Sequence, residues 1–142
     1  MRPKAQKDYS HRAVTDKLDI KTDHAVRNIG RGDPELLERV IEKSGRKLVT
    51  ARTRADIILY WPKSAAEITP QLVKLKTKIA HNGGIWVFTA KKGLSSQSGM
   101  DHIKREDVIP LGLAAALVDN KSCSASARES ALWFVIRKAD RS

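Results

Sequence analysis

Two nearly continuous apolar runs, Ala55–Tyr60 and Ile85–Thr89, constrain the fold of this chain more than any other feature. A strand whose side chains do not alternate between apolar and polar is buried on both faces, which is typical of the centre of a parallel sheet. Parallel neighbours need a crossover connection, usually a helix packed on the sheet. The two runs therefore predict an α/β fold.

The segment between the two runs carries the signals of such a helix. Thr69 suits the N-cap, Pro70 suits the first helical position, and Asn82-Gly83-Gly84 provides an end signal. We expect a helix between these boundaries. Its inward-facing residues would be Leu72, Leu75 and Ile79, which recur with helical spacing.

The residues before the first run predict a second unit of the same kind. Ala25–Ile29 is typical of a strand, which closes at Gly30-Arg31-Gly32. A helix then follows, with Asp33 as N-cap, Pro34 at its first position and Gly45 as its stop signal. Its buried stripe would consist of Leu36, Leu37, Val40 and Ile41.

Two shorter elements complete this half of the chain. Lys47–Ala51 predicts a second short strand. Ser10 is suited to cap a short helix, with Val14 and Leu18 four residues apart on one face. Residues 1–9 have no apolar periodicity and are expected to form a flexible basic arm.

The C-terminal part predicts a helix and a hairpin. The helix runs from about Asp107 through Leu117 and Val118, with Pro110 tolerated in its first turn only. Two extended segments follow, near residues 120–125 and 132–137, and the short link Ser126–Ser130 permits only antiparallel pairing.

These elements predict a Rossmann-like three-layer sandwich. The mostly parallel sheet would have about six strands and end in an antiparallel hairpin, with right-handed crossovers and helices on both faces. A chain of 142 residues is long enough for one hydrophobic core. We therefore expect a single domain over residues 10–139.

The charge of the chain points to anionic partners. The 27 Lys and Arg residues exceed the 16 Asp and Glu residues, which leaves a net charge of +11. Such a chain attracts polyanions, so non-specific binding of nucleic acid is one expectation. Cations spread along the whole sequence also simply solubilise exposed faces, and the sequence reveals no sorted patch.

The single cysteine, Cys123, excludes an internal disulfide framework and favours a cytoplasmic location. No segment reaches the roughly 20 apolar residues of a membrane-spanning helix, so no membrane partner is expected. The histidines have no ligand spacing, no G-x-S-x-G nucleophile elbow or P-loop is present, and we assign no metal ligand or catalytic residue.

The order of elements resembles the class I S-adenosylmethionine-dependent methyltransferase fold, shortened by about one α/β repeat after the second strand. The segment that carries this resemblance runs from Asp56 to Phe88. It consists of the strand Ala55–Leu59, a helix, and the glycine-led strand that begins after His81-Asn82-Gly83-Gly84. The resemblance implies a shortened methyltransferase-like topology.

The chain also resembles a bacterial family of small proteins known only as a domain of unknown function, number 3052. This resemblance covers roughly Tyr9 to Arg137 and implies a fold, since that family brings no established activity. The residues that carry it are Tyr9-Ser10, Leu18-Asp19-Ile20-Lys21, Ala55–Leu59, Gly83–Val87, Lys91-Lys92, Leu117-Val118-Asp119 and Ser130-Ala131-Leu132.

Ligands of open α/β sheets bind beyond the carboxyl ends of the parallel strands, so we expect the functional site at this edge. The loops that should meet there are rich in cations, including Arg52 and Arg54, and a field of that sign favours phosphate or carboxylate ligands. The candidate anion site consists of Gly30, Arg31, Gly32, Lys63, Lys91, Lys92 and Arg128.

The glycine loop and the strand after it lack parts of a nucleotide-binding fingerprint. Gly30-Arg31-Gly32-Asp33 has no third glycine, and the second strand runs into Thr50–Arg54 instead of an acidic residue that would bind ribose hydroxyls. The turn is therefore either bare turn geometry or a phosphate cradle at a helix N-terminus. The cationic sulfonium of S-adenosylmethionine fits this edge poorly.

Trp61-Pro62 lies where some methyltransferases have an acidic or amide residue before a proline and an aromatic residue. Tyr60 and Trp61 stand there instead, so Trp61 is expected to be a packing residue. Trp86 and Trp133 are expected in the core. This departure favours a non-catalytic protein.

Three classes of function remain open. The first is a non-catalytic or degenerate methyltransferase-like module that binds an anionic small molecule such as a nucleotide. The second is a basic protein associated with nucleic acid, and the third is an S-adenosylmethionine-dependent methyltransferase with an unorthodox site. We assign no cofactor, and the sequence leaves a nucleotide and S-adenosylmethionine open as alternatives.

Overall fold

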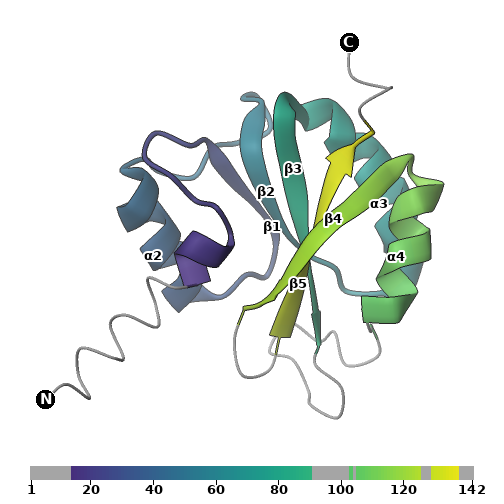
Figure 1. Cartoon of the computed structure of the whole chain (residues 1–142). Coiled ribbons are helices and arrows are strands. Elements are labelled where there is room, and N and C mark those ends of the chain that lie inside the picture. The colour runs from purple at the N-terminus through teal and green to yellow at the C-terminus, as the bar shows by residue number, and fades with distance from the viewer. Residues whose placement is uncertain (1–13, 91–102, 104, 126–128, 138–142) are drawn as a thin grey trace, which may run out of the picture.

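The computed structural model describes residues 14–90, 103, 105–125 and 129–137, in which five strands form one sheet. In chain order they are β1 (Val26–Gly30), β2 (Ala55–Trp61), β3 (Ile79–Ala90), β4 (Leu117–Ser124) and β5 (Glu129–Ile136). Their order across the sheet is β1-β2-β3-β5-β4 (Figure 1). β1, β2 and β3 are parallel, and β5 runs antiparallel to both β3 and β4. The predicted mixed sheet with a C-terminal antiparallel hairpin is confirmed.

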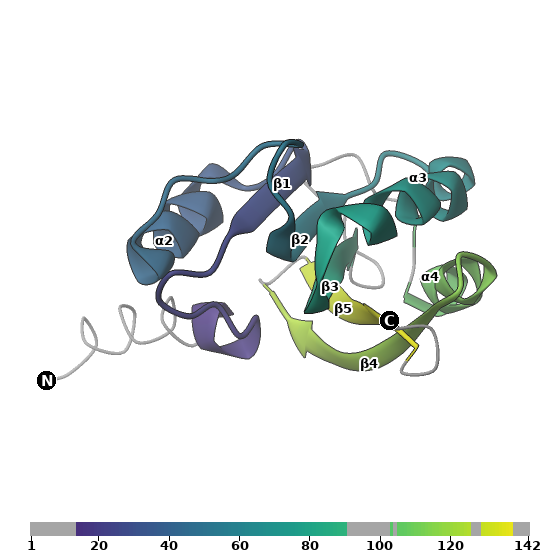
Figure 2. The same ribbon diagram turned by 90° about the horizontal axis from the view of Figure 1, so that it is seen from above.

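Helices cover both faces of the sheet. They are α2 (Pro34–Ser44), α3 (Ile68–Leu75) and α4 (Arg105–Ala114), and residues 14–17 form a further helical turn. Figure 2 shows α2 and this turn on one side and α3 and α4 on the other. The three-layer arrangement of the prediction is therefore present. No helix among the described residues is long and apolar enough to cross a membrane.

The sequence signals at both ends of α2 have the predicted roles. Asp33 Oδ1 accepts a 3.1 Å hydrogen bond from Glu35 N, and Pro34 occupies the first turn. Gly45 adopts the left-handed conformation with φ of 75° and donates its backbone N–H to Ile41 O. The inward face is narrower than predicted: Ile41 is 37% exposed, whereas Leu36 and Val40 are buried.

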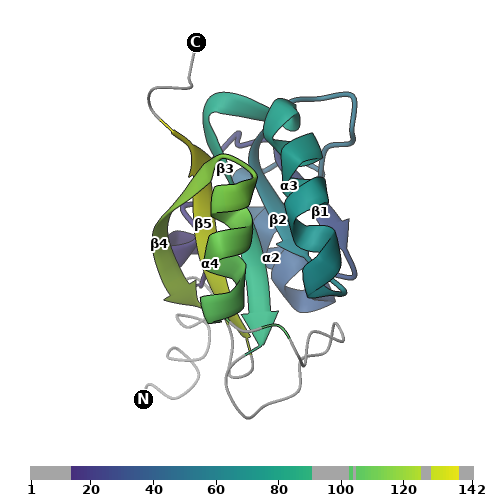
Figure 3. The ribbon, with the colours of Figure 1, turned by 90° about the vertical axis from the view of Figure 1, so that its right-hand side faces the viewer.

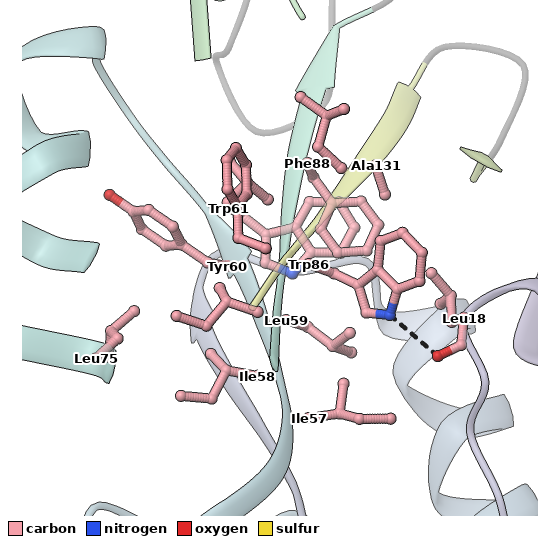
Figure 4. Packing of buried hydrophobic residues seen from close by; sticks show 14 of the residues in the cluster. Leu18, Ile57, Ile58, Leu59, Tyr60, Trp61, Leu75, Trp86, Phe88 and Ala131 are labelled. Carbon is pink, nitrogen blue, oxygen red and sulfur yellow. Dashed lines mark hydrogen bonds between the residues drawn. The ribbon is translucent and has the colours of Figure 1, made fainter. Parts of the chain in front are cut away.

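Trp61 of β2 and Trp86 and Phe88 of β3 fill the core on the α2 side, whereas Tyr60 of β2 points to the other face (Figure 4). Trp86 is fully buried, and its indole Nε1 donates a 3.0 Å hydrogen bond to Leu18 O, which fixes the N-terminal helical turn to the sheet. On the opposite face, α3 and α4 lie side by side (Figure 3). Thr69 Oγ1 joins them by donating to Leu111 O over 2.9 Å.

Four predictions about helices and strands are wrong. The first concerns Gly83 and Gly84, which do not end a helix but lie inside β3. A Cβ on Gly83 would lie 2.5 Å from Asp56 O, and one on Gly84 would lie 2.4 Å from the Trp133 ring. These glycines allow neighbouring strands to approach. The requirement comes from residues distant in sequence, but a pair of glycines looks like a turn signal when the sequence is read locally. Ile79 therefore begins β3 instead of ending a helix.

The second concerns the start of α3, which lies before the predicted N-cap. A 3-10 turn, Ala65–Glu67, leads directly into α3, and Glu67 takes the N-cap position without a capping hydrogen bond from its side chain to the helix. Thr69 and Pro70 both lie inside the first turn. The hydroxyl of Thr69 is used for contact with α4, so tertiary packing overrides its capping preference.

The third concerns Lys47–Ala51, which is not a strand. The segment still lies beside β1, because Val49 N donates a 2.8 Å hydrogen bond to Val26 O. Arg54 then directly precedes Ala55, the first residue of β2. Arg52 and Arg54 therefore lead into the amino end of β2 and do not follow the carboxyl end of a strand.

The fourth concerns the end of α4. Leu117 belongs to β4 and not to the helix, because Ala116 takes the left-handed conformation with φ of 66° and reverses the chain. Pro110 lies beyond the first turn of α4, where its nitrogen cannot donate to the carbonyl of Glu106. A Cβ on Gly112 would lie 2.1 Å from the Phe134 ring, so close packing on β5 holds this helix in place.

Candidate functional site at the carboxyl edge

The carboxyl ends of the parallel strands form a common edge of the sheet. Gly30, the last residue of β1, pairs with Trp61, the last residue of β2. Ala90 ends β3 at the same edge and pairs with Glu129 at the start of β5. The helices that follow β1 and β2 pack on opposite faces of the sheet, which is the geometry that opens a ligand crevice between two strands (Figure 2).

The turn after β1 needs both of its glycines. Gly30 has a φ of 99° and Gly32 a φ of 75°, and both angles are unfavourable for residues with a Cβ. A Cβ on Gly30 would also lie 2.5 Å from Trp61 O, so the turn lies directly against the end of β2. Turn geometry and a close approach to β2 together account for these two glycines.

Trp61 is a packing residue, as predicted. Its side chain is 2% exposed and stacks on Phe88 with 3.8 Å between ring centroids and 6° between ring planes (Figure 4). Its indole Nε1 donates a 2.7 Å hydrogen bond to Asn28 Oδ1. Asn28 Nδ2 in turn donates to Gly30 O over 3.2 Å. The three strand ends are thus joined by one stack and one hydrogen bond of Trp61, and the second hydrogen bond lies within β1.

Charges of both signs lie at this edge. Arg31 and Lys63 are exposed on the neighbouring turns that follow β1 and β2. The N-terminus of α2 is capped by the carboxylate of Asp33, which adds a negative charge beside the glycine turn. Glu129 is 4% exposed, so the edge also contains a buried carboxyl group.

The structure brings together four of the predicted site residues: Gly30, Arg31, Gly32 and Lys63. Lys91, Lys92 and Arg128 lie outside the described residues, as does the N-terminal arm. The sequence analysis missed Asn28 and Glu129. Asn28, an uncharged polar residue near the end of the predicted strand Ala25–Ile29, could have been identified from the sequence, whereas nothing in the sequence distinguishes Glu129 from a loop residue.

A second polar contact lies on the α3 side of the same edge. Tyr60 is 1% exposed and its hydroxyl donates a 2.7 Å hydrogen bond to Glu67 Oε2. Burial, the hydrogen bond to Glu67 and the charge of that carboxylate, in this order, raise the pKa of Tyr60 above its usual value. Tyr60 is therefore a neutral hydrogen-bond donor at physiological pH. The described residues contain no group of three or more His, Cys, Asp or Glu that could hold a metal ion.

Comparison with known proteins finds a family model that matches the sequence and solved structures with a similar fold. A family model described as "Protein of unknown function (DUF3052)" matches residues 15–138. No curated protein matches the sequence.

Solved structures with a similar fold include methyltransferases. An S-adenosylmethionine-dependent methyltransferase from Aquifex aeolicus is 10% identical with a TM-score of 0.64, and the match covers 87% of this chain and 88% of that one. The pyocyanin biosynthetic protein PhzM is 12% identical with a TM-score of 0.66, covering 90% of this chain and 54% of PhzM. Human N-acetylserotonin methyltransferase, solved with its methyl donor, is 12% identical with a TM-score of 0.63, covering 89% of this chain and 51% of that enzyme. The chain therefore spans about half the length of the last two proteins, and at these identities the likeness establishes the fold alone.

Proposed function

The chain belongs to the DUF3052 family of proteins of unknown function, and we propose that it is a non-catalytic, methyltransferase-like module that binds an anionic ligand, such as a nucleotide, at the carboxyl edge of its sheet. The observation that carries this proposal is the pairing of Gly30 with Trp61. It brings the turns that bear Arg31 and Lys63 next to each other.

The exposed charges of these turns support an anionic ligand. Arg31 follows Gly30 directly, and Lys63 is two residues beyond Trp61. An arginine presents a planar set of donors to phosphate or carboxylate, and a lysine adds a point charge. The net charge of +11 attracts anions from a distance and raises their concentration near the protein. Arg31 and Lys63 would then supply the local contacts that hold the ligand.

The environment of Trp61 supports a role without catalysis. A residue that orients a reacting amine needs a polar group directed at the ligand, whereas Trp61 is buried against Phe88 and its only N–H is bonded to Asn28. Asp33, the nearest carboxylate of the glycine turn, is used to cap α2. These contacts of Trp61 and Asp33 support anion binding over methyl transfer as the role of this edge.

Calorimetric titration at physiological salt tests the proposal. The titrants are ATP, inorganic pyrophosphate, S-adenosylmethionine and a short single-stranded oligonucleotide. Saturable binding of ATP or pyrophosphate is expected, with about tenfold weaker affinity in Arg31→Ala and in Lys63→Ala, because each variant removes a charge-assisted contact. Lys47→Ala is the matched control, since Lys47 is exposed at the far end of α2.

The outcomes separate the three classes of function. Saturable binding of S-adenosylmethionine with no binding of pyrophosphate would overturn the proposal in favour of a methyltransferase. Binding of the oligonucleotide alone, with a steep loss as salt rises and equal effects of all three lysine and arginine variants, would reduce the site to general polycation behaviour.

A further inference from the structure

A pocket lies at the opposite edge of the sheet from the site described above. Its volume is about 280 Å³, close to the lower end of the range for small-molecule sites, roughly 300 Å³. Asp56 and Asn82 contribute to it from the amino ends of β2 and β3. The whole lining consists of Asp19, Lys21, His24, Asp56, Ile57, Asn82 and Trp133.

One side of this pocket is aromatic and apolar. Trp133 of β5 is only partly buried, and its six-membered ring lies against Gly84, where a Cβ would be 2.4 Å from the ring. Gly84 pairs with Ile57, the other apolar residue of the lining. The absence of a side chain at Gly84 thus lets the indole lie across the sheet next to the pocket.

The carboxylate of Asp56 is fixed at the pocket wall. Asp56 Oδ2 accepts a 2.8 Å hydrogen bond from Ala25 N, and the side chain is only partly buried. A carboxylate has two oxygens with about four acceptor positions, so this bond leaves Asp56 able to accept from a ligand. His24 Nδ1, also in the lining, accepts a 3.1 Å hydrogen bond from Lys21 N.

The chain itself places an ammonium group beside the same residues. Lys121 Nζ forms an ion pair with Asp19 and lies 5.9 Å from the ring centroids of both Trp86 and Trp133. An ammonium that faces indole rings and a carboxylate gains both cation–π attraction and charge pairing. The rings of Trp86 and Trp133 therefore already have one cation of the chain beside them.

The lining of the pocket suits an organic cation better than a metal ion. The described His, Cys, Asp and Glu side chains form no group that could coordinate a metal, so Asp19, His24 and Asp56 do not converge on one point. An indole face offers nothing to a hydrated metal ion but contacts the carbon atoms of an organic cation. We propose that this pocket binds a small primary ammonium or guanidinium compound, held by the charge of Asp56 and the indole of Trp133.

This site is independent of the anion site proposed above. It lies at the amino edge of the sheet and selects the opposite charge. General electrostatics oppose it, because the chain carries a net charge of +11 and repels cations. Saturable binding of a cation therefore has to come from local contacts.

Three probes of equal length test the proposal: butylammonium, butanol and butyrate. They are titrated into the full-length protein at physiological salt by calorimetry and by NMR of the three indole N–H resonances. Butylammonium is expected to bind saturably and to shift the Trp133 resonance. The Trp61 resonance is the internal control, since that indole is buried and bonded to Asn28.

Two substitutions isolate the contacts. Asp56→Asn keeps an oxygen that can accept from Ala25 N and removes the charge, so the fold is retained and the affinity falls about tenfold. Lys121→Gln removes the cation that already faces the indoles and raises the affinity about threefold. Trp133→Leu lowers the affinity and serves as a second test if Asp56→Asn proves unstable. Lys74→Gln, an exposed position on α3 outside the pocket lining, leaves the affinity unchanged.

Three results would overturn the proposal. They are binding of butyrate or butanol as tight as that of butylammonium, an unchanged affinity in a folded Asp56→Asn or Trp133→Leu variant, and the absence of saturable butylammonium binding. None of these results bears on the anion site, because its probes and its variants are different.

Discussion

Trp61 at the end of β2 donates a 2.7 Å hydrogen bond from its indole Nε1 to Asn28 Oδ1 of β1. Trp61 also stacks on Phe88 of β3, so one side chain links three parallel strands at the edge proposed to bind ligand. Stability at this edge and the geometry of the glycine turn therefore depend on the same residue.

Trp61→Phe keeps an aromatic ring against Phe88 and removes the hydrogen bond to Asn28. Because Asn28 Oδ1 loses its donor in a partly buried place, the free energy of unfolding is expected to fall by about 1–3 kcal/mol. Urea denaturation measures this change. A double-mutant cycle with Asn28→Leu should yield a coupling of at least about 0.5 kcal/mol, and additive effects would contradict the role assigned to the bond.

Gly30→Ala is expected to cost more than Gly45→Ala. Both glycines have positive φ angles, but a Cβ on Gly45 meets nothing within 4 Å, whereas one on Gly30 would lie 2.5 Å from Trp61 O. Gly45→Ala therefore reports the backbone strain alone, about 1–2 kcal/mol, and Gly30→Ala adds displacement of β2. Thermal denaturation of the two variants compares them directly. Equal losses would mean that the turn after β1 can move away from Trp61 without cost.

Asp33→Asn is expected to strengthen anion binding while leaving stability nearly unchanged. Asparagine caps a helix about as well as aspartate, so α2 keeps its N-terminal hydrogen bond to Glu35 N. Removal of the negative charge beside Arg31 should raise the affinity for pyrophosphate about two- to fivefold. Calorimetry measures this effect. Glu42→Gln, which removes the same charge near the other end of α2, is the control and should change little.

Alkaline pH is expected to weaken the contribution of Tyr60 to stability. Burial, followed by the hydrogen bond to Glu67, raises the pKa of Tyr60 in the folded protein, whereas in the unfolded chain the phenol ionises near pH 10. Below about pH 10 both states are protonated and the contribution is complete; above it the unfolded state releases its proton first and stability falls. The difference in unfolding free energy between wild type and Tyr60→Phe should therefore shrink between about pH 9 and 11.

Burial raises the pKa of the Cys123 thiol as well, so ionisation of this group also lowers the stability at alkaline pH. It is present in both wild type and Tyr60→Phe and cancels in their difference. A difference that stays constant up to the highest pH measured would contradict the protonated state assigned to Tyr60.

Local signals predicted the elements whose ends are determined locally. Asp33, Pro34 and Gly45 define α2 because a cap, a preorganised φ and a left-handed stop each act within one turn. Gly83 and Gly84 misled the prediction because their role is contact with Asp56 O and Trp133, which are distant in sequence. Ala116 gave no signal at all, since alanine rarely takes the left-handed conformation that ends α4.

Of the two candidate sites, one could be predicted from the sequence and the other could not. The carboxyl edge followed from the order of elements, so the structure brings Gly30, Arg31 and Lys63 together as expected. The amino-edge pocket was not predicted, because its residues come from four separate segments and depend on the position of the Trp133 ring. Asp56, a lone carboxylate in an apolar run, was its only visible sign in the sequence.

The interior position of β5, between β3 and β4, has a consequence for how the protein is made. β5 pairs with β3 on one side and β4 on the other, yet among the strands of the described residues it comes last in the chain. During translation β3 therefore keeps an open edge, and β4 has no partner, until residue 136 has left the ribosome. A nascent chain stalled before this point exposes pairing edges of the kind that lead to aggregation and chaperone capture.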